Sequence, residues 1–510
     1  MEPEDTLKNT FNHIIQFIRE HPQIFILLVS LCFAFSSVAQ QREMDDEQIV
    51  LVLESQFAKS QGIPENNIDI ISEDGIVSLS GHVNNLLVKR EAREVTMSIR
   101  GVVGVIDRME VKNKVVADDK IKENIKSAIS KNPATKNYKV NISVNDGVVT
   151  LGGKVDSWQE KELTEMLAEK VIGVRSIENN LIFTATADRS DFDLKQDIWY
   201  NLKWDRRIDE NLIEIKVNDG VVFISGKVGS AWEKNWVGLK SWINGVEKVD
   251  VSGLKVREKY SQDEIREEVI TIVPDTEIRK AVENVFQIDP RVKREKIKIT
   301  VKNGEVLLSG KVNSLQAKNA AADDANNIVG VWKVNNLLKV QPSIIPDNKQ
   351  LVSDVEWVLN QNPYLEDIEV HVFAENGKIT LQGAVDAQFE VDLAEELAMD
   401  VDGVLSVQNN LIVDSNLMPK DFTYHNYYRS YMPGPYQVLG INDKEIKDDI
   451  EEQIWWSPFI NPENIKVEVN EGRALLTGKV NSSQEKQYAT INALEAGALA
   501  VDNRLKVSKN

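Results

Sequence analysis

The 510-residue sequence contains a single cysteine, Cys32, so the chain cannot form an intramolecular disulfide. The lack of further cysteines also leaves no thiol pair to build a zinc site. Histidines are few, and no two of them have the spacing of metal ligands. The five are His13, His21, His82, His371 and His425. Because no serine or aspartate lies in a recognisable nucleophile motif, we expect no catalysis, no metal site and no cofactor.

Basic residues are in the minority. The chain has 60 Lys and Arg against 80 Asp and Glu, which gives a net charge of −20. This excess of negative charge disfavours binding of the whole surface to nucleic acid or to an anionic membrane. With 42% hydrophobic and 27% charged residues, the composition is that of a soluble globular protein. The length leaves room for several domains of ~100–200 residues.

One long apolar stretch, "IFILLVSLCFAFSSVAQ", occupies residues 24–40. Its strongly apolar part, Ile24 to Phe35, is shorter than a membrane span of about 20 residues and suits the core of a signal peptide. Small residues at 37 and 39 then offer a cleavage site. Acidic residues in the leader are unusual for a signal peptide, so a retained N-terminal membrane anchor is the alternative. Either role for residues 1–40 exports the chain that follows.

Six copies of a short string are the most prominent feature of the sequence. The copy "VNDGVVTLGGKV" spans 144–155, and every copy holds two glycines six residues apart. The pairs are Gly75 and Gly81, Gly147 and Gly153, Gly220 and Gly226, Gly304 and Gly310, Gly377 and Gly383, and Gly472 and Gly478. Alternating apolar residues on both sides predict a β-hairpin whose turn requires positive φ. The second glycine falls on the apolar phase, so we expect it to face the core where another backbone approaches closely.

Helical periodicity flanks each hairpin. Before the fourth hairpin, Ile278, Ala281 and Val285 recur at helical spacing, and after the second, Ser157 and Glu160 have the capping-box form. A third strand then carries asparagine on its apolar phase, which we expect to be buried and hydrogen-bonded to the backbone of a neighbouring loop. These residues are Asn179, Asn336, Asn409 and Asn503. The sequence therefore predicts an α+β fold: a tandem repeat of α-β-β-α-β domains, each a three-stranded mixed sheet with two helices on one face.

The hairpin pattern of Asp/Asn-Gly followed by Ser-Gly, with Gly-Val and Asn-Leu in the third strand, resembles the BON domain (bacterial osmotically inducible periplasmic protein and nodulation domain). The segments "WDRRI" from Trp204 and "IDPRV" from Ile288 are also similar to that family. The copies cover 45–112, 117–184, 191–257, 275–341, 347–414 and 443–508. The resemblance implies a non-catalytic periplasmic protein of the osmotic-stress type that binds phospholipid or envelope surfaces. Two departures are Asp107, in place of the third-strand asparagine, and Gly253, which indicates a bulge. Domains this small bury only about 60% of their surface, so neighbours should pack together.

The copies differ in net charge. The fourth has 12 basic and 8 acidic residues, whereas the fifth has 2 basic and 15 acidic residues. A basic group in the fourth copy is a candidate site for anionic lipid headgroups. Its members are Arg279, Lys280, Arg291, Lys293, Arg294, Lys296 and Lys298. The alternative is a solvated face, or a basic patch that meets the acidic fifth copy.

The insert before the sixth copy, residues 415–442, is too rich in aromatics for a solvated linker. It either packs as an ordered loop on its own domains or presents a surface to lipid or polypeptide. The candidate partner-binding residues are Phe422, Tyr424, Tyr427, Tyr428, Tyr431 and Tyr436. Two functions follow from these features: binding to phospholipid surfaces in support of the envelope under osmotic stress, or a holdase or scaffold for other exported proteins. No feature indicates nucleic acid or a small-molecule substrate.

Overall fold

The structure is a computed structural model of the whole chain. It describes residues 44–59, 63, 67–183, 189–257, 273–293, 295–366, 368–385, 388–413, 443–457, 460–470, 473–496, 498 and 500–508. The apolar stretch 24–40, the aromatic insert with its six candidate residues, Arg294 and Gly472 lie outside these ranges. Within them, no helix is both long enough and apolar enough to cross a membrane.

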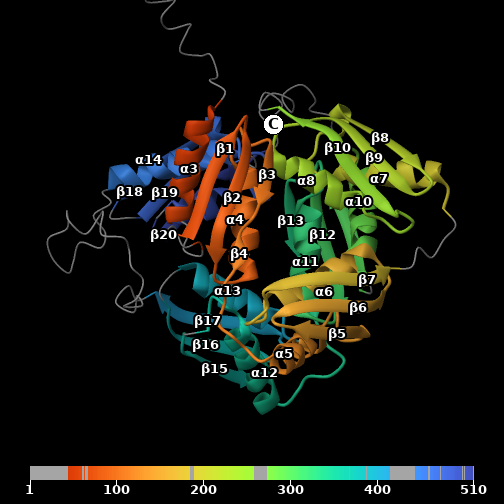
Figure 1. Ribbon diagram of the computed structural model, residues 1–510, viewed down its shortest axis with the longest axis vertical. Coiled ribbons are helices and arrows are strands. Elements are labelled where there is room, and N and C mark those ends of the chain that lie inside the picture. Colours follow the sequence, from red (N-terminus) through yellow and green to blue (C-terminus); the bar gives the residue numbers. More distant parts are fainter. Residues whose placement is uncertain are drawn as a thin grey trace, which may run out of the picture. The chain divides into compact units, whose positions relative to one another are not determined.

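Six units with the same element order make up the described chain, and we call them repeats 1 to 6 (Figure 1). Repeat 1 comprises α3 (Asp46–Lys59), β1 (Ile68–Glu73), β2 (Ile76–Val83), α4 (Leu86–Ser98), β3 (Gly104–Asp107) and β4 (Glu110–Val111). Repeat 2 comprises α5 (Asp118–Lys131), β5 (Val140–Asn145), β6 (Val148–Val155), α6 (Trp158–Glu169) and β7 (Ser176–Phe183). Repeat 3 comprises α7 (Asp191–Trp204), the 3-10 helix η2 (Glu210–Leu212), β8 (Ile213–Asn218), β9 (Val221–Val228), α8 (Ala231–Lys240) and β10 (Lys248–Val256).

The second half of the chain repeats this order. Repeat 4 comprises α10 (Asp275–Ile288), β11 (Lys296–Lys302), β12 (Glu305–Val312), α11 (Leu315–Asn326), β13 (Lys333–Asn336) and β14 (Lys339–Val340). Repeat 5 comprises α12 (Asn348–Gln361), β15 (Val370–Glu375), β16 (Lys378–Val385), α13 (Gln388–Met399) and β17 (Ser406–Val413). Repeat 6 comprises α14 (Asp443–Trp456), η6 (Pro462–Asn464), β18 (Ile465–Asn470), β19 (Arg473–Val480), α15 (Ser483–Glu495), β20 (Ala500–Asn503) and β21 (Lys506–Val507).

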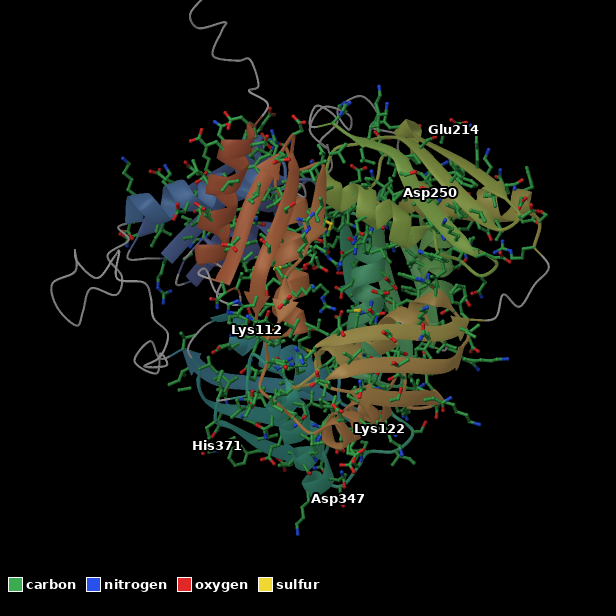
Figure 2. The ribbon with its side chains drawn as sticks, viewed as in Figure 1. Lys112, Lys122, Glu214, Asp250, Asp347 and His371 are labelled. Atoms are coloured by element: carbon green, nitrogen blue, oxygen red, sulfur yellow. The ribbon has the colours of Figure 1, made fainter. Side chains whose placement is uncertain are left out.

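Each repeat has its own sheet, and the predicted fold class is confirmed. In repeat 2, β6 is the central strand, antiparallel to β5 and parallel to β7. Two helices bury one face of each sheet; the other face is exposed, as at Glu214 on β8 and His371 on β15 (Figure 2). In repeats 1, 4 and 6 the third strand is divided into two short pieces that both pair with the central strand. The predicted bulge in repeat 3 is present, because the register of β10 shifts between Asp250 and Gly253.

The hairpin turns have the predicted backbone conformation. In repeat 2, Asp146 and Gly147 have φ of 50° and 72°, the two positive angles of a type I′ turn. The first residue of the first helix holds this turn: the Asp118 carboxylate accepts hydrogen bonds from the backbone N–H groups of Asp146 (2.9 Å) and Gly147 (3.0 Å). Asp46, Asp191 and Asp275 make the same pair of contacts in their repeats. These hydrogen bonds join residues that are far apart in the sequence, and the sequence patterns did not predict them.

The second glycine of each hairpin does lie against another backbone, as predicted. A Cβ atom on Gly153 would lie 2.7 Å from the carbonyl oxygen of Lys139, the residue before the paired strand β5. The corresponding distances are 2.6 Å at Gly383 and 2.9 Å at Gly310, and Gly81, Gly226 and Gly478 are closer still to the equivalent carbonyl. All six have positive φ, so both space and backbone conformation favour glycine.

The third-strand asparagines are hydrogen-bonded, but to a helix and not to a loop. The Nδ2 group of Asn179 donates to the carbonyl oxygen of Lys161 in α6 (3.1 Å), and its Oδ1 accepts from the N–H of Leu181 (3.2 Å). Asn336, Asn409 and Asn503 repeat both bonds. Each amide thus joins the second helix to the third strand. In repeat 1, Asp107 occupies this position and pairs with Lys89 at 3.4 Å.

Substituting Asn179 by leucine should therefore lower the local free energy of unfolding of repeat 2 by about 1–3 kcal/mol, because the N–H of Leu181 loses its acceptor in a partly buried position. Amide hydrogen exchange in β6 and β7 measures this free energy. The matched control is Asn180→Leu, at the exposed adjacent position of β7. Equal protection in the two variants would show that the amide is not a structural link.

Within the compact unit formed by residues 45–510, repeats 1 and 6, 2 and 5, and 3 and 4 contact each other in a nested order, and further contacts join other repeats, such as 2 with 4 and 4 with 6. Repeats 1 and 6 meet through Gln56 and Gln453, whose side chains are hydrogen-bonded at 2.6 Å. Both are the eleventh residue of their 14-residue helices, α3 and α14. Contact between equivalent positions is the mark of a two-fold relation. The outermost repeats are therefore partners.

Repeats 2 and 5 form a second such pair. Lys131 of α5 forms an ion pair with Asp354 of α12, and Asn124 is hydrogen-bonded to Gln361. Lys131 and Gln361 each end their helix, and Asn124 and Asp354 each lie seven residues earlier. Exchanging the positions of α5 and α12 therefore turns one contact into the other, as at an isologous interface.

Repeats 3 and 4 are the third pair. Trp204, the last residue of α7, is buried in the hydrophobic core of repeat 4. Next to it, Asp205 forms an isolated β-bridge with Ile328, and Arg206 donates hydrogen bonds to the carbonyl oxygens of Asn326 and Val331 (3.2 Å each). Neighbouring repeats also touch elsewhere, for example where Trp158 of repeat 2 stacks on Trp242 of repeat 3 at 5.8 Å.

Candidate functional site

The structure does not bring the basic candidates of repeat 4 together into one patch. Arg279 and Lys280 lie on the exposed side of α10 and pair along that helix with Glu283 (3.2 Å) and Glu277 (3.0 Å). Exposed pairs of this kind contribute little to stability. Their charges are also largely balanced within the helix.

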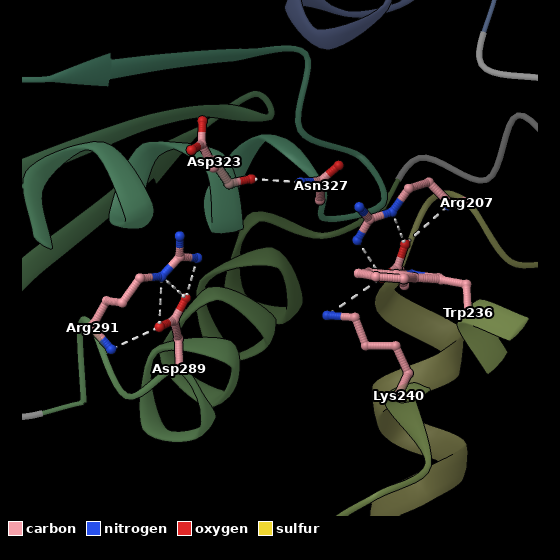
Figure 3. A network of polar contacts seen from close by, with 8 residues as sticks. Arg207, Trp236, Lys240, Asp289, Arg291, Asp323 and Asn327 are labelled. Carbon is pink, nitrogen blue, oxygen red and sulfur yellow. Dashed lines mark hydrogen bonds and ion pairs between the residues drawn. The ribbon is translucent and has the colours of Figure 1, made fainter. Parts of the chain in front are cut away.

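Arg291 and Lys293 each contact an acidic residue of the protein. Arg291 binds the Asp289 carboxylate at 2.6 Å, and this partner raises the pKa of the guanidinium further, although burial alone would lower it (Figure 3). Lys293 forms an ion pair with Glu160 of repeat 2, which is 1% exposed. Both charges therefore have an acidic partner within the protein, although the Arg291 side chain is 37% exposed.

Lys296 and Lys298 differ from the others because they are exposed on the outer face of the sheet. They alternate along β11 with Ile297 and Ile299, which pack against the core of repeat 4. Four more lysines lie on the same outer face, and all six are exposed. The full set is Lys296, Lys298, Lys302, Lys311, Lys333 and Lys339. We call this set the lysine face.

Three members of the lysine face stand in a row across the sheet. Lys296 of β11 is directly opposite Lys311 of β12, and Lys311 is directly opposite Lys339 of β14. Among the described residues, none of the three has an ion-pair partner. Like charges directly opposite one another in a sheet are destabilising. A bound anion would remove this destabilisation.

The only acidic residue in the strands of this sheet is Glu305, at the other end of the face. It pairs with Lys333 at 2.9 Å, and the hydrogen bonds from Lys333 and Asn335 hold the pKa of its carboxyl below the usual value. Between the two ends lies Leu337, which is 64% exposed. The face therefore combines a strongly positive end with an exposed apolar side chain.

Acidic residues of repeat 5 form ion pairs with repeat 2, and Asp400 also interacts electrostatically with Arg291 of repeat 4. Besides the pair of Asp354 with Lys131, Asp402 binds Lys136 at 2.7 Å and Glu396 lies 4.0 Å from Lys170. The alternative that the basic group meets the acidic fifth copy stays a prediction, and the interaction of Arg291 with Asp400 supports it. Repeat 2 has balanced charge overall, so its composition gave no sign that its lysines gather on the side facing repeat 5.

A second polar network lies in repeat 3 beside repeat 4 (Figure 3). The Asp205 carboxylate, 5% exposed, accepts hydrogen bonds from Arg207 (2.7 and 2.8 Å) and from the indole N–H of Trp236 (2.9 Å), and Lys240 lies 3.6 Å away. Arg207 and Lys240 both lie against the Trp236 ring, at 4.2 and 5.1 Å from its centre. Every charge in this network is paired, which indicates a structural role.

No group of three or more His, Cys, Asp or Glu side chains within the described ranges could hold a metal ion. The lysine face is thus the strongest candidate for recognition of a ligand by charge in this part of the chain.

Comparison with known proteins gives one family across the chain. The sequence model of the BON domain matches residues 45–113, 117–185, 190–258, 274–342, 347–415 and 442–509. The chain is 28% identical over 145 residues to Osmotically-inducible protein Y of Escherichia coli, covering 27% of this chain and 72% of that protein. It is 30% identical over 142 residues to Outer membrane lipoprotein DolP of Haemophilus influenzae, covering 27% of this chain and 73% of that protein. With six matched segments over nearly the whole described chain, this protein belongs to the BON-domain family.

Proposed function

We propose that this protein is a non-catalytic envelope protein that binds anionic phospholipid surfaces through the lysine face of repeat 4. The observation that carries the proposal is the row formed by Lys296, Lys311 and Lys339, three opposed cations without a counter-charge among the described residues. A sheet gains nothing from such a row in water, whereas a layer of phosphate groups binds all three at once.

The cellular setting rests on the relatives and on the leader. One relative is named for osmotic induction and another for the outer membrane, so a periplasmic protein that supports the envelope under osmotic stress fits both. The apolar stretch 24–40 supports export, either as a cleaved signal peptide or as an N-terminal anchor.

The net charge of −20 does not oppose a local interaction of this kind. In physiological salt, charges are screened beyond about 8 Å, so a surface interacts with the nearest side chains and not with the whole chain. Each lysine near an anionic membrane contributes about 1 kcal/mol. The row of three thus accounts for roughly 3 kcal/mol, or about a hundredfold in affinity.

The triple variant Lys296→Gln, Lys311→Gln, Lys339→Gln should lose about a hundredfold in affinity for vesicles of phosphatidylglycerol and phosphatidylcholine. Co-sedimentation over a range of salt concentrations measures both the affinity and its salt dependence. The matched control removes three exposed lysines from helices of repeats 2 and 3: Lys122→Gln (Figure 2), Lys126→Gln and Lys195→Gln. Arg291 and Lys293 are left intact, because their substitution would break the internal ion pairs.

Equal binding by the triple variant and the control would refute the lysine face as the site. Deletion of 415–442 tests the other candidate, a holdase or scaffold that uses the aromatic insert. If this deletion abolishes suppression of aggregation of an unfolded protein while vesicle binding by the parent is absent, the second function replaces the first.

A further inference from the structure

Repeat 1 packs on repeat 2 at the junction of α4 and α6. Leu86, the first residue of α4, packs against the hydrophobic core of repeat 2. One turn later, Arg90 forms an ion pair with Glu169, the last residue of α6. The side-chain amide of Asn113, which follows repeat 1, donates a hydrogen bond to the carbonyl oxygen of Val174 in repeat 2 (2.9 Å). Apolar and polar contacts thus join the two repeats.

Acidic side chains outnumber basic ones at this junction. Three glutamates of α6 lie three and four residues apart, so they share one side of the helix. They are Glu162, Glu165 and Glu169. The side chains of α4 that act electrostatically on them are Glu94 and two arginines, Arg90 and Arg93. Four carboxylates therefore share two cations.

Glu162 is half-buried, yet within the part of the chain that the structure describes it forms no hydrogen bond and no ion pair. The other carboxylates have partners. Arg90 binds Glu169 and lies 4.0 Å from Glu94, and Glu165 accepts a hydrogen bond from the side-chain amide of Asn179 in β7 (2.7 Å).

The remaining elements packed on α6 present apolar side chains to it. From α5 these include Ile125, and from β6 Leu151, both in the core of repeat 2. Repeat 3 reaches the start of α6 through Trp242, which stacks on Trp158 and whose carbonyl oxygen accepts a hydrogen bond from Gln159 (2.8 Å). The charge balance around Glu162 is therefore determined by α4 and α6.

This balance favours the protonated form of Glu162. Burial, followed by the charges of Glu165 and Glu169, raises the pKa of Glu162 from its usual value of 4.5 to about 7, and the two arginines offset this only in part. Because the pKa in the junction lies above the usual value, the contact is most stable while Glu162 is protonated. Its stability falls as the pH rises from 4.5 to about 7 and then levels off, when Glu162 is ionised.

We propose that the junction of α4 and α6 is a pH-sensitive contact, which holds repeat 1 on repeat 2 below neutral pH and loosens above it. A protonated Glu162 is neutral and lies beside Glu165 and Glu169 without repulsion. Its ionisation adds a third negative charge to one side of α6, while Arg90 is already bound to Glu169. Loosening uncovers Leu86 and this side of α6. The junction is separate from the lysine face, and the proposal does not depend on the membrane function.

The test uses NMR of the full chain with labelled methyl and glutamate carboxyl groups. The ratio of closed to loosened junctions should fall about tenfold between about pH 6 and about pH 8, as the linkage of one proton to a pKa of about 7 requires. NOEs between the methyl groups of Leu86 and those of the repeat 2 core should weaken over this range and recover when the pH is lowered again. The carboxyl signal of Glu162 should titrate with the same midpoint.

Glu162→Gln keeps the size of the side chain and removes its ionisation, so this variant should retain the Leu86 contacts at about pH 8. The control is Glu178→Gln, an exposed position on β7 of the same repeat, which should loosen with the parent midpoint. A glutamine variant that loosens like the parent overturns the proposal, and so do Leu86 contacts in the parent that do not change with pH. A Glu162 carboxyl that titrates at the usual value of 4.5 overturns it as well. Because the last two measurements need no variant, the test remains decisive if a substitution prevents folding.

Discussion

Replacement of Asp205 by alanine should lower the free energy of unfolding by about 3–5 kcal/mol, the largest effect expected of a single charged residue here. The substitution leaves Arg207 and Lys240 beside the half-buried Trp236 ring without the carboxylate that both contact, and it also removes the acceptor of the Trp236 N–H. Removing one member of a buried ion pair costs much more than the pair contributes, because the remaining charges stay desolvated.

Chemical unfolding of the intact chain, with hydrogen exchange in β8 and β9, would measure this effect. The control is Asp502→Ala, which breaks the exposed pair with Arg504 in repeat 6 and should have little effect on stability. A similar loss in both variants would show that the Asp205 network is no stronger than a surface pair.

The pH dependence of this network has a definite sign. Burial alone would raise the pKa of Asp205, but Arg207, Lys240 and the Trp236 hydrogen bond together hold it well below the usual value. Because the folded pKa lies below that of the unfolded chain, the carboxylate contributes stability above about pH 4 and loses it as the pH falls toward the folded pKa. The difference in stability between the parent protein and Asp205→Asn should therefore shrink below about pH 4.

Gly226→Val should destabilise repeat 3 by at least about 2 kcal/mol. The added Cβ would overlap the carbonyl oxygen of Leu212, and valine is strained at a φ of 131°. The same change at Gly153 or Gly310, where the carbonyl is farther away, should cost about 1–3 kcal/mol. Melting of the intact chain, with hydrogen exchange in the affected hairpin, would rank the three.

Gly104 provides the control for this series. It lies in β3, its φ is not in the left-handed region, and a Cβ there would meet nothing within 4 Å. Gly104→Ala should leave the melting behaviour nearly unchanged. If Gly226→Val also left the melting behaviour unchanged, the paired strand would not approach Gly226 closely.

The sequence predicted what depends on local structure. Type I′ turns, alternating strands and capping boxes are each determined by residues within one hairpin or one helix. Asp146 and Gly147 are therefore enough to predict the turn, and Ser157 is enough to predict the start of a helix. The close approach at Gly153 was also predictable, because a glycine on the apolar phase of a strand leaves space that a neighbouring backbone can fill.

The sequence could not identify partners across the fold. Periodicity shows that a helix has a buried face, but not whether the face of α5 meets α12 or some other helix. Lys293 and Lys296 looked alike in a run of basic residues, yet one pairs with Glu160 and the other faces solvent. The alternation of Lys296 with Ile297 along a strand was the available signal for the lysine face. The row with Lys311 and Lys339 needs the strand register as well.

The nested order of the repeats has a consequence for how the chain reaches its folded state. Repeats 3 and 4 are adjacent in sequence and close the shortest loop, whereas repeat 1 must wait for repeat 6 to be synthesised. We expect repeats 3 and 4 to assemble first, then repeats 2 and 5, and finally repeats 1 and 6. In a chain that stops before repeat 6, the α3 surface of repeat 1 lacks its partner. We expect a quality-control protease to recognise this uncovered surface and so to degrade incompletely synthesised chains.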